Sequence, residues 1–370
     1  MNESTKKQLE IDEVASLLRS VIQRVAVGPD RGRDITRLEA KQVMDAILRD
    51  EVDPVQVAVF FIALRMKRES LDEFSGLFDS MQSNITQVTV NVPELTCLAD
   101  PFDGYVRHLT MTPFLPATLA ACGMPALIHG VNSVGPKHGI TSSKVYQLAN
   151  INTKLTQADA AEVIAQRGWS YLDQSVYAPK LYGLNELRDT IVKRTALTTL
   201  ERLLMPLCGI NETHLVLGYV HKAYPHIYAG IASQAGYQSS LLLKGVEGGL
   251  APALNKPLRQ YYFNSNELAE MDFSDHALVD QYKEVRDIGD EISADVAAQT
   301  VGDVVINKLA EECLELGLDV LSGHHNVARK SLCLAAGQIL FAHKRVQSMG
   351  EAVAKVSECL DNGHAKELFL

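Results

Sequence analysis

Ile128-His129-Gly130-Val131-Asn132-Ser133-Val134-Gly135-Pro136-Lys137-His138-Gly139 follows a short apolar run and precedes a segment that predicts a helix from about Thr141. In an open α/β sheet, ligands bind beyond the carboxyl ends of the strands, where loops and helix N-termini gather. The glycines, small polar residues and lysine of this stretch offer backbone N–H groups and a cation, which suit an anionic phosphate. A glycine-rich loop before a helix is, by itself, more often plain turn chemistry. The stretch therefore predicts a strand, a loop and a helix, with a phosphate site as a hypothesis.

On both sides of this stretch, short apolar runs alternate with segments of helical periodicity. The runs that predict strands are Leu95–Leu98, Ala126–His129, Ser170–Leu172, His214–Val220, Leu241–Lys244 and Gln260–Phe263. Strands that alternate with helices predict an α/β domain with a mainly parallel central sheet flanked by helices. From Asp290 onward the chain is expected to be helical again, in two amphipathic stretches at Val301–Val320 and His325–Val346.

The first 85 residues predict a small domain made only of helices. Apolar residues at helical spacing indicate helices at Val14–Val25, after Thr36, at Val55–Met66 and at Ser70–Met81. Thr36 followed by Glu39 is a capping-box signature for the second of these. The third is apolar around its whole circumference, so we expect it to be buried in the domain or against a second subunit.

Composition limits the class of protein. The 370 residues suffice for two domains, and a hydrophobic content of 46% allows a sizeable core. The net charge of −10 argues against a chain that coats nucleic acid with its whole surface, although a local basic cleft stays open. Six scattered cysteines form no metal-ligand spacing, and no apolar run reaches the length of a membrane span. These features predict a cytoplasmic protein with reduced thiols and no membrane partner.

The quoted stretch resembles the H-G-N-R-S-V-S-S-K-S-G loop of the anthranilate phosphoribosyltransferase family, which cradles phosphoribosyl pyrophosphate. The matching positions are His129, Gly130, Ser133, Val134, Lys137 and Gly139. The family's Asn and Arg fall on Val131 and Asn132, and its paired serines fall on Gly135 and Pro136. The resemblance implies that a phosphoribosyl donor binds in the inter-domain cleft through Asp103, Gly104, His129, Gly130, Asn132, Ser133, Lys137 and Gly139.

Other segments resemble the same family in the same order along the chain. They are Leu38–Lys67, His214–Tyr219 and the tail segments Asn326–Ala328, Gly350–Ala352 and Asn362–Ala365. The resemblance implies a helical domain over residues 1–85, joined by a helical segment from about 155–210, and an α/β phosphate-binding domain over residues 90–370. It also implies a homodimer formed through the N-terminal helices.

Two of the family's catalytic motifs are altered in this chain. The pyrophosphate-binding G-T-G-G-D-G turn corresponds to Ala99-Asp100-Pro101-Phe102-Asp103-Gly104-Tyr105, in which proline removes an N–H donor and phenylalanine adds bulk. The adjacent Asp-Glu pair that holds magnesium is reduced to Glu247 in Lys244–Pro252, so Mg²⁺ is only weakly supported. We expect weak or absent activity toward anthranilate, and whether the chain is an enzyme at all stays open, with the family favouring a transferase.

The acceptor side of the reaction is ambiguous. The family grips the anthranilate carboxylate with an arginine in V-R-x-x-L-G-x-R-T, and Leu187–Thr195 matches it at Arg188, Arg194 and Thr195. Because the following segment is longer here, an ungapped alignment would put Val192 at the key position instead. We favour Arg188, although an ordinary salt-bridged helix residue is nearly as good an interpretation.

Three functions remain in competition. The first is a phosphoribosyltransferase with an altered phosphate loop. The second is a catalytically degraded paralogue that binds nucleic acid in a basic groove, through Lys193, Arg194, Arg202 and Lys222, together with Lys137, Lys180, Lys244 and the rings of Tyr177, Tyr182 and Tyr219. The third is a dimeric scaffold whose loop residues only cap a helix.

Overall fold

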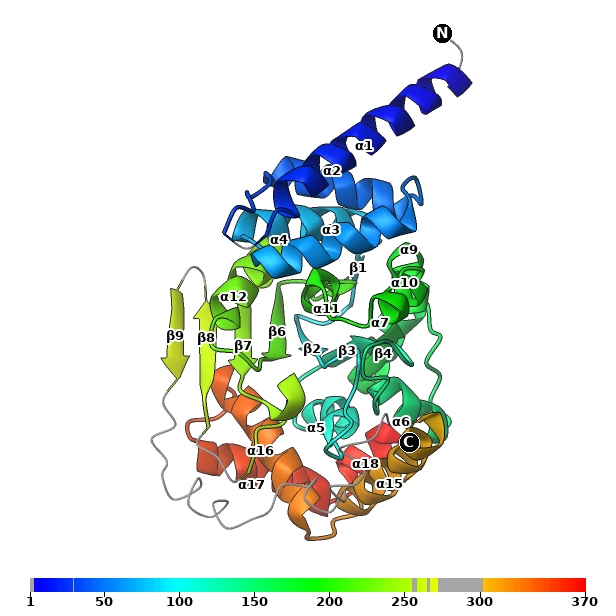
Figure 1. Cartoon of the computed structure of the whole chain (residues 1–370). Coiled ribbons are helices and arrows are strands. Elements are labelled where there is room, and N and C mark those ends of the chain that lie inside the picture. Colours follow the sequence, from blue (N-terminus) through cyan, green and yellow to red (C-terminus); the bar gives the residue numbers. More distant parts are fainter. Residues whose placement is uncertain (1–2, 29, 255–257, 265–266, 272–301) are drawn as a thin grey trace.

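The computed structural model describes residues 3–28, 30–254, 258–264, 267–271 and 302–370, and its N-terminal part is entirely helical (Figure 1). The helices are α1 (Glu3–Val25), α2 (Arg37–Leu48), α3 (Pro54–Lys67) and α4 (Leu71–Ser83). The predicted capping box is confirmed, because the Thr36 hydroxyl accepts from the Glu39 N–H while the Glu39 carboxylate accepts from the Thr36 N–H. The Asp53 carboxylate caps α3, with proline at its first position.

The larger part of the chain forms around one seven-stranded sheet, in the order β4-β3-β2-β6-β7-β8-β9. The strands are β2 (Glu94–Ala99), β3 (Ala126–Gly130), β4 (Trp169–Asp173), β6 (Glu212–Gly218), β7 (Ser239–Leu243), β8 (Gln260–Asn264) and β9 (Glu267–Met271). The first five run parallel, and β8 and β9 continue the sheet antiparallel. The predicted fold class, a helical domain beside a mainly parallel α/β domain, is confirmed.

The helices cover both faces of this sheet. Those of the middle of the chain are α5 (Leu115–Ala121), α6 (Ser142–Leu148), α7 (Gln157–Arg167), α8 (Gln174–Tyr177), α9 (Pro179–Tyr182), α10 (Asn185–Ile191), α11 (Ala196–Leu200) and α12 (Tyr224–Ala235). Short 3₁₀ turns lie at η1 (Thr112–Phe114), η2 (Glu201–Leu203) and η3 (Val246–Gly248). The closing helices are α15 (Asp303–Leu321), α16 (Val327–Ala342), α17 (Met349–Asp361) and α18 (His364–Phe369). The helix expected from Asp290 lies outside the described residues as far as 301.

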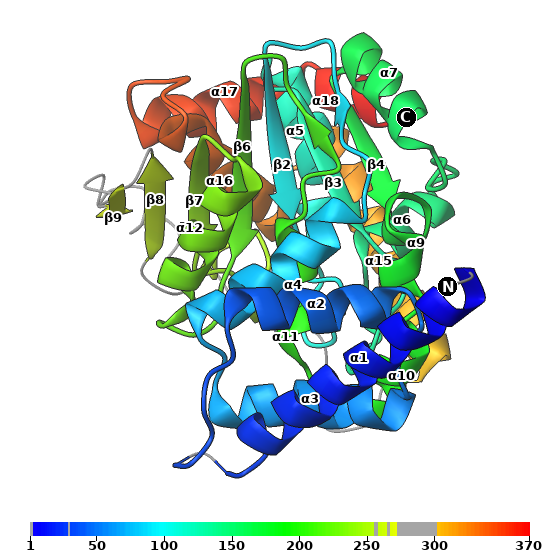
Figure 2. The same ribbon diagram turned by 90° about the horizontal axis from the view of Figure 1, so that it is seen from above.

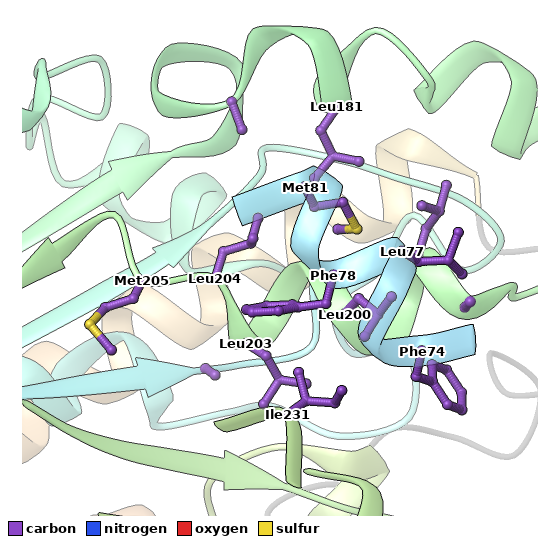
Figure 3. Packing of buried hydrophobic residues seen from close by; sticks show 14 of the residues in the cluster. Phe74, Leu77, Phe78, Met81, Leu181, Leu200, Leu203, Leu204, Met205 and Ile231 are labelled. Atoms are coloured by element: carbon purple, nitrogen blue, oxygen red, sulfur yellow. The ribbon is translucent and has the colours of Figure 1, made fainter. Parts of the chain in front are cut away.

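Two hydrophobic cores divide the sheet between them, because alternate residues of each strand point to opposite faces. One core joins Leu95 of β2 and Leu215 of β6 to the N-terminal helices, and the other joins Leu98 and Val216 to α5 and the closing helices. Figure 3 shows the first core, where Phe74 and Phe78 of α4 lie among leucines of the segment before β6. In Figures 1 and 2 the four N-terminal helices and the closing helices accordingly lie on opposite sides of the molecule.

The resemblance implied a helical segment over residues 155–210. In the structure this segment also contains the buried strand β4 and the short strand β5 (Leu207–Cys208). β5 pairs in parallel with β1 (Val88–Thr89), and α11 packs against both α3 and α4. We propose that this segment completes the helical domain of residues 1–85. Among the described residues, none of the helices combines the length and apolar character required to cross a membrane.

Candidate functional site

The quoted loop leaves the carboxyl end of β3 and lies against the turn that leaves β2. The Gly139 N–H donates to the Asp103 carbonyl at 2.9 Å, and Tyr105 and Ile140 exchange backbone hydrogen bonds at 3.0 and 2.8 Å. Gly104 has a φ of +71°, and a Cβ there would lie 2.5 Å from the Ile140 carbonyl oxygen. The two loops predicted to bind phosphate therefore touch each other, and the retained glycines permit that contact.

Phe102 fills the space between these two loops. Its buried ring packs against Val131 and Val134, and its plane meets the His129 ring edge-on at 85°, with centroids 5.5 Å apart. His129 Nδ1 lies 2.9 Å from the Tyr177 hydroxyl, and burial together with the charge of Arg202 lowers the pKa of His129 to about 3. The imidazole is therefore neutral near pH 7 and offers no charge to a phosphate.

Asp103 holds both cations of this region. Its carboxylate accepts from Arg194 Nη2 at 2.6 Å and Nε at 2.9 Å, and Lys137 Nζ lies 3.6 Å away. Arg65 of α3 donates to the Arg194 carbonyl, which joins the N-terminal helices to the same network. Lys137 and Arg194, predicted to face a ligand, are thus neutralised by a buried carboxylate of the chain itself.

Glu247 is surrounded by hydrogen-bond donors from two other loops. Its carboxylate accepts from the N–H groups of Val106 and Arg107, the latter at 2.9 Å, and lies 3.2 Å from His108 Nδ1 and 3.1 Å from Lys137 Nζ. Burial by itself raises the pKa of Glu247, but the hydrogen bond from His108 and the charge of Lys137 outweigh it and hold the pKa at about 2. The carboxylate occupies a cationic nest of the kind that binds anions.

This arrangement does not fit a magnesium ion at Glu247. Mg²⁺ requires several oxygen ligands in an octahedron, whereas the groups that face Glu247 are N–H donors and a lysine. The nearby Asp100 is also unsuitable, because its buried carboxyl accepts from the Tyr105 hydroxyl at 2.6 Å. Burial raises the pKa of Asp100 to about 7, so the carboxyl is only about half ionised near neutral pH.

Comparisons with known proteins place this geometry in a family. The model described as glycosyl transferase family, helical bundle domain, matches residues 19–85, and the model described as glycosyl transferase family, a/b domain, matches residues 109–366. The chain belongs to this glycosyl transferase family. The membership expected from the His129–Gly139 loop is therefore confirmed.

Family members similar to the whole chain carry the name anthranilate phosphoribosyltransferase. That of Methanopyrus kandleri is 23% identical over 95% of this chain and 97% of its own, and that of Xylella fastidiosa is 25% identical over 91% and 92%. An uncharacterized protein of Aquifex aeolicus is 22% identical over 92% of this chain and 98% of its own.

Solved structures of the family share the fold. The Thermus thermophilus anthranilate phosphoribosyltransferase has a TM-score of 0.70 at 19% identity, over 95% of this chain and 97% of its own. The Saccharomyces cerevisiae enzyme, solved in complex with PRPP and Mg, has a TM-score of 0.70 at 13% identity, over 96% of each chain. At these identities the likeness concerns the fold alone.

Arg188, the predicted acceptor-binding residue, lies in a buried ion pair. Its guanidinium donates to both oxygens of Glu201, at 2.6 and 2.8 Å, and neither side chain is more than 4% exposed. Val192, the ungapped alternative, is an exposed residue that ends α10. Glu201 accepts from both terminal nitrogens of the guanidinium, so the salt-bridge interpretation describes the contacts of Arg188, and a role toward an acceptor stays a prediction.

The basic groove predicted for a polyanion is not assembled as expected. Arg202 is buried, and its Nη2 donates to the carbonyls of Ala99, Gly218 and Gly248, so it joins the strand ends instead of facing solvent. Lys193 and Lys222 are exposed, and no ion pair is recorded for either among the described residues. Of the four predicted groove cations, Arg194 is paired, Arg202 is buried and two remain accessible.

The other face of the loop borders an open cleft of about 970 Å³ between α6, α10 and α15. Asn132 and Ser133 line it, and Ser133 Oγ lies 3.0 Å from His138 Nδ1 while His138 Nε2 lies 3.3 Å from Asp189. His138, Asp189 and the donors His108 and Arg107 were missed from the sequence. His138 has a φ of +49°, and no spacing rule predicts contacts between residues brought together by such a turn.

Proposed function

We propose that the chain is a phosphoribosyltransferase-family protein that binds a phosphorylated ligand of the phosphoribosyl pyrophosphate class in the cleft beside Lys137, with little or no activity toward anthranilate. The observation that carries this proposal is the set of donors around Glu247. Two backbone N–H groups, an imidazole and an ammonium converge on one carboxylate, at 2.9 to 3.4 Å. A phosphate oxygen accepts from the same types of donor.

The ligand would have to displace Glu247 from these donors. The residue lies in a turn flanked by Gly245 and Gly248, and its own φ of +49° belongs to the left-handed region that is costly for a side-chain-bearing residue. A strained turn between glycines can move at a lower cost than a strand or a helix. We infer that Glu247 acts as an internal substitute for the ligand phosphate.

The same geometry supports weak or absent transfer to anthranilate. Transfer of a phosphoribosyl group requires donors and metal ions that stabilise the departing pyrophosphate. Here Phe102 fills the space between the two phosphate loops, Pro101 has no N–H, and Glu247 does not fit Mg²⁺. Arg188, the residue that would hold the acceptor carboxylate, is bound to Glu201.

Calorimetry with phosphoribosyl pyrophosphate, with and without Mg²⁺, tests the proposal. We expect binding by the wild-type chain, at least tenfold weaker binding by Lys137→Ala, and tighter binding by Glu247→Gln, which removes a competing anion. Lys308→Ala, at an exposed position on α15, is the matched control and should bind like the wild type. Absence of binding at millimolar ligand in both the wild type and Glu247→Gln would overturn the proposal.

Nucleic acid is the alternative ligand, favoured by the exposed cations Arg107, Lys193 and Lys222. If it binds, the affinity for single-stranded DNA should fall steeply with salt, because each neutralised phosphate releases counterions. Lys193→Ala combined with Lys222→Ala should reduce both the affinity and the salt slope. A response that is flat in salt would eliminate this alternative.

We also propose that two copies associate through α3. Val55, Val59 and Met66 are exposed on this helix at 69%, 42% and 62%, and Val59 and Met66 border an apolar hollow of about 540 Å³ that reaches α1. Exposed apolar side chains gathered on one helix suit a self-complementary contact between two copies. Light scattering should give the mass of a dimer for the wild type and of a monomer for Val59→Asp. A monomeric wild type would contradict the proposal.

A further inference from the structure

Three potential metal ligands lie together at the amino ends of β2 and β6, at the opposite edge of the sheet from the phosphate loops. Glu94 of β2 is the register partner of Glu212 of β6. His214 follows Glu212 by two residues, so both side chains point to the same face of the sheet. Parallel pairing therefore brings two carboxylates and one imidazole to the same face of the sheet, at the same edge.

The spacing of these groups matches a coordination sphere. His214 Nε2 lies 3.4 Å from Glu212 Oε2 and 3.8 Å from Glu94 Oε2, and one ligand atom of each residue lies within 4.8 Å of the others. Metal–ligand bonds of about 2.0–2.2 Å in a tetrahedron separate neighbouring ligand atoms by about 3.3–3.6 Å. The separation from Glu94 is wider than this, so a bound ion would require the partly exposed Glu94 carboxylate to move from Arg345 toward the other two ligands.

The imidazole of His214 is oriented by a contact at its other ring nitrogen. Its Nδ1 lies 2.8 Å from the Ser239 hydroxyl, which leaves Nε2 directed at the two carboxylates. Metal-binding histidines characteristically use their second nitrogen for an outer hydrogen bond of this kind.

A second imidazole adds an independent observation. The His343 ring packs edge-on against His214, with centroids 4.8 Å apart. His343 Nδ1 lies 2.8 Å from the Ile339 carbonyl, to which it donates, so its buried Nε2 carries a lone pair that has no partner among the described residues. An unsatisfied buried acceptor costs free energy, and a hydrogen-bond donor such as a water molecule would satisfy it.

We propose that Glu94, Glu212 and His214 bind a divalent transition-metal ion of the Zn²⁺ type, with a remaining position open to water. The imidazole ligand and the tetrahedral spacing favour Zn²⁺ or Co²⁺ over Mg²⁺, which prefers oxygen ligands in an octahedron. Arg345, which pairs with Glu94, is a competitor for the carboxylate. This site does not depend on the function proposed for the phosphate loops.

Titration of the untagged full-length chain with Zn²⁺, and with Co²⁺ as a spectroscopic probe, tests the site. We expect one ion per chain, with Co²⁺ absorption of nitrogen and oxygen ligands and no thiolate charge-transfer band. Glu212→Gln should weaken Zn²⁺ binding at least tenfold, and His214→Ala should abolish it. His226→Ala, an exposed histidine on α12, is the control and should bind like the wild type.

Two further outcomes decide the proposal if His214→Ala fails to fold. Glu212 is 52% exposed, so Glu212→Gln keeps the fold and isolates the ligand effect. Arg345→Gln removes the competing cation and should tighten Zn²⁺ binding severalfold. Equal affinity of the wild type, Glu212→Gln and Arg345→Gln, or a thiolate band that assigns the ion to cysteine, would overturn the site.

Discussion

The two edges of the central sheet differ in how far their charged side chains are paired within the chain. At the carboxyl edge, Lys137 and Arg194 are both held by Asp103, and Lys137 also reaches Glu247, so the cations of the family's phosphate cleft are already matched. At the amino edge, Glu94 and Glu212 lie side by side, and Arg345 is the cation paired with them in the described chain. The first edge is internally neutralised, and the second keeps surplus negative charge.

The contrast shows that one fold can pair the charges within the chain at one edge of its sheet and leave a carboxylate unmatched at the other. Phe102 and the two carboxylates at the carboxyl edge add packing and ion pairs in the place where a ligand would contribute them. At the amino edge, strand register brings Glu94 and Glu212 together, and His214 lies close to both carboxylates. The following changes test this difference, beginning with the largest expected effect.

Arg188→Met should destabilise the carboxyl edge most. It leaves Glu201 buried with an unpaired charge, and removal of one partner of a buried pair costs about 3–5 kcal/mol. Chemical denaturation of the single variant, of Glu201→Met and of the double variant measures this cost. The double variant should recover most of the lost stability. A single variant as stable as the wild type would show that the ion pair with Glu201 is not needed for the fold.

Phe102→Ala tests whether stability has replaced ligand contact. Deletion of the buried ring should lower the free energy of unfolding by about 3 kcal/mol, since large-to-small changes leave a cavity. The same change reopens the space between the two loops, so affinity for phosphoribosyl pyrophosphate should rise. Denaturation and calorimetry on the same sample measure both effects. A variant that loses stability without any gain in affinity would show that the Phe102 ring does not obstruct the ligand.

Glu247 should make the carboxyl edge sensitive to acid. Its pKa is lowered to about 2, so its contribution is complete above the unfolded value of about 4.3 and is lost as the pH falls toward 2. A loss of about 3 kcal/mol is expected over that window. Unfolding measured between pH 5 and pH 2 should show a shallower decline for Glu247→Gln than for the wild type. Identical declines would indicate that other carboxylates dominate.

The elements of the fold could be predicted because they depend on local periodicity and capping. The Thr36–Glu39 box predicted α2, and the apolar runs predicted the strands of the central sheet from β2 to β8, apart from ends such as Val220, which lies beyond the end of β6 at Gly218. The last strand, β9, was missed because Glu267–Met271 is not an apolar run. The run at Ser170–Leu172 also predicted β4 correctly, so the helical segment that the resemblance implied at 155–210 conflicted with the chain's own apolar pattern.

The site was less predictable, because its charges are decided by partners distant in sequence. Arg202 looked like an exposed groove cation, yet it binds the carbonyls at the ends of β2 and β6. Glu247 looked like a metal ligand, yet it lies 3.1 Å from Lys137, a residue 110 positions away. The replacement of the family's glycines by Pro101 and Phe102 was visible in the sequence. The position of the Phe102 ring between the two loops was not.

Glu212→Gln, at the amino edge, should have the smallest effect on the protein without metal. Glu94 and Glu212 face each other across the strands, and removal of one of two opposed like charges should change the free energy of unfolding by less than about 0.5 kcal/mol. With Zn²⁺ at about 100 times its dissociation constant, the wild type should instead gain about 2.7 kcal/mol, because the ion binds the folded state. Thermal unfolding of both proteins with and without Zn²⁺ measures this difference. If Zn²⁺ stabilises both proteins equally, Glu212 does not bind the ion. The two edges would then differ only in how completely their charges are paired within the chain.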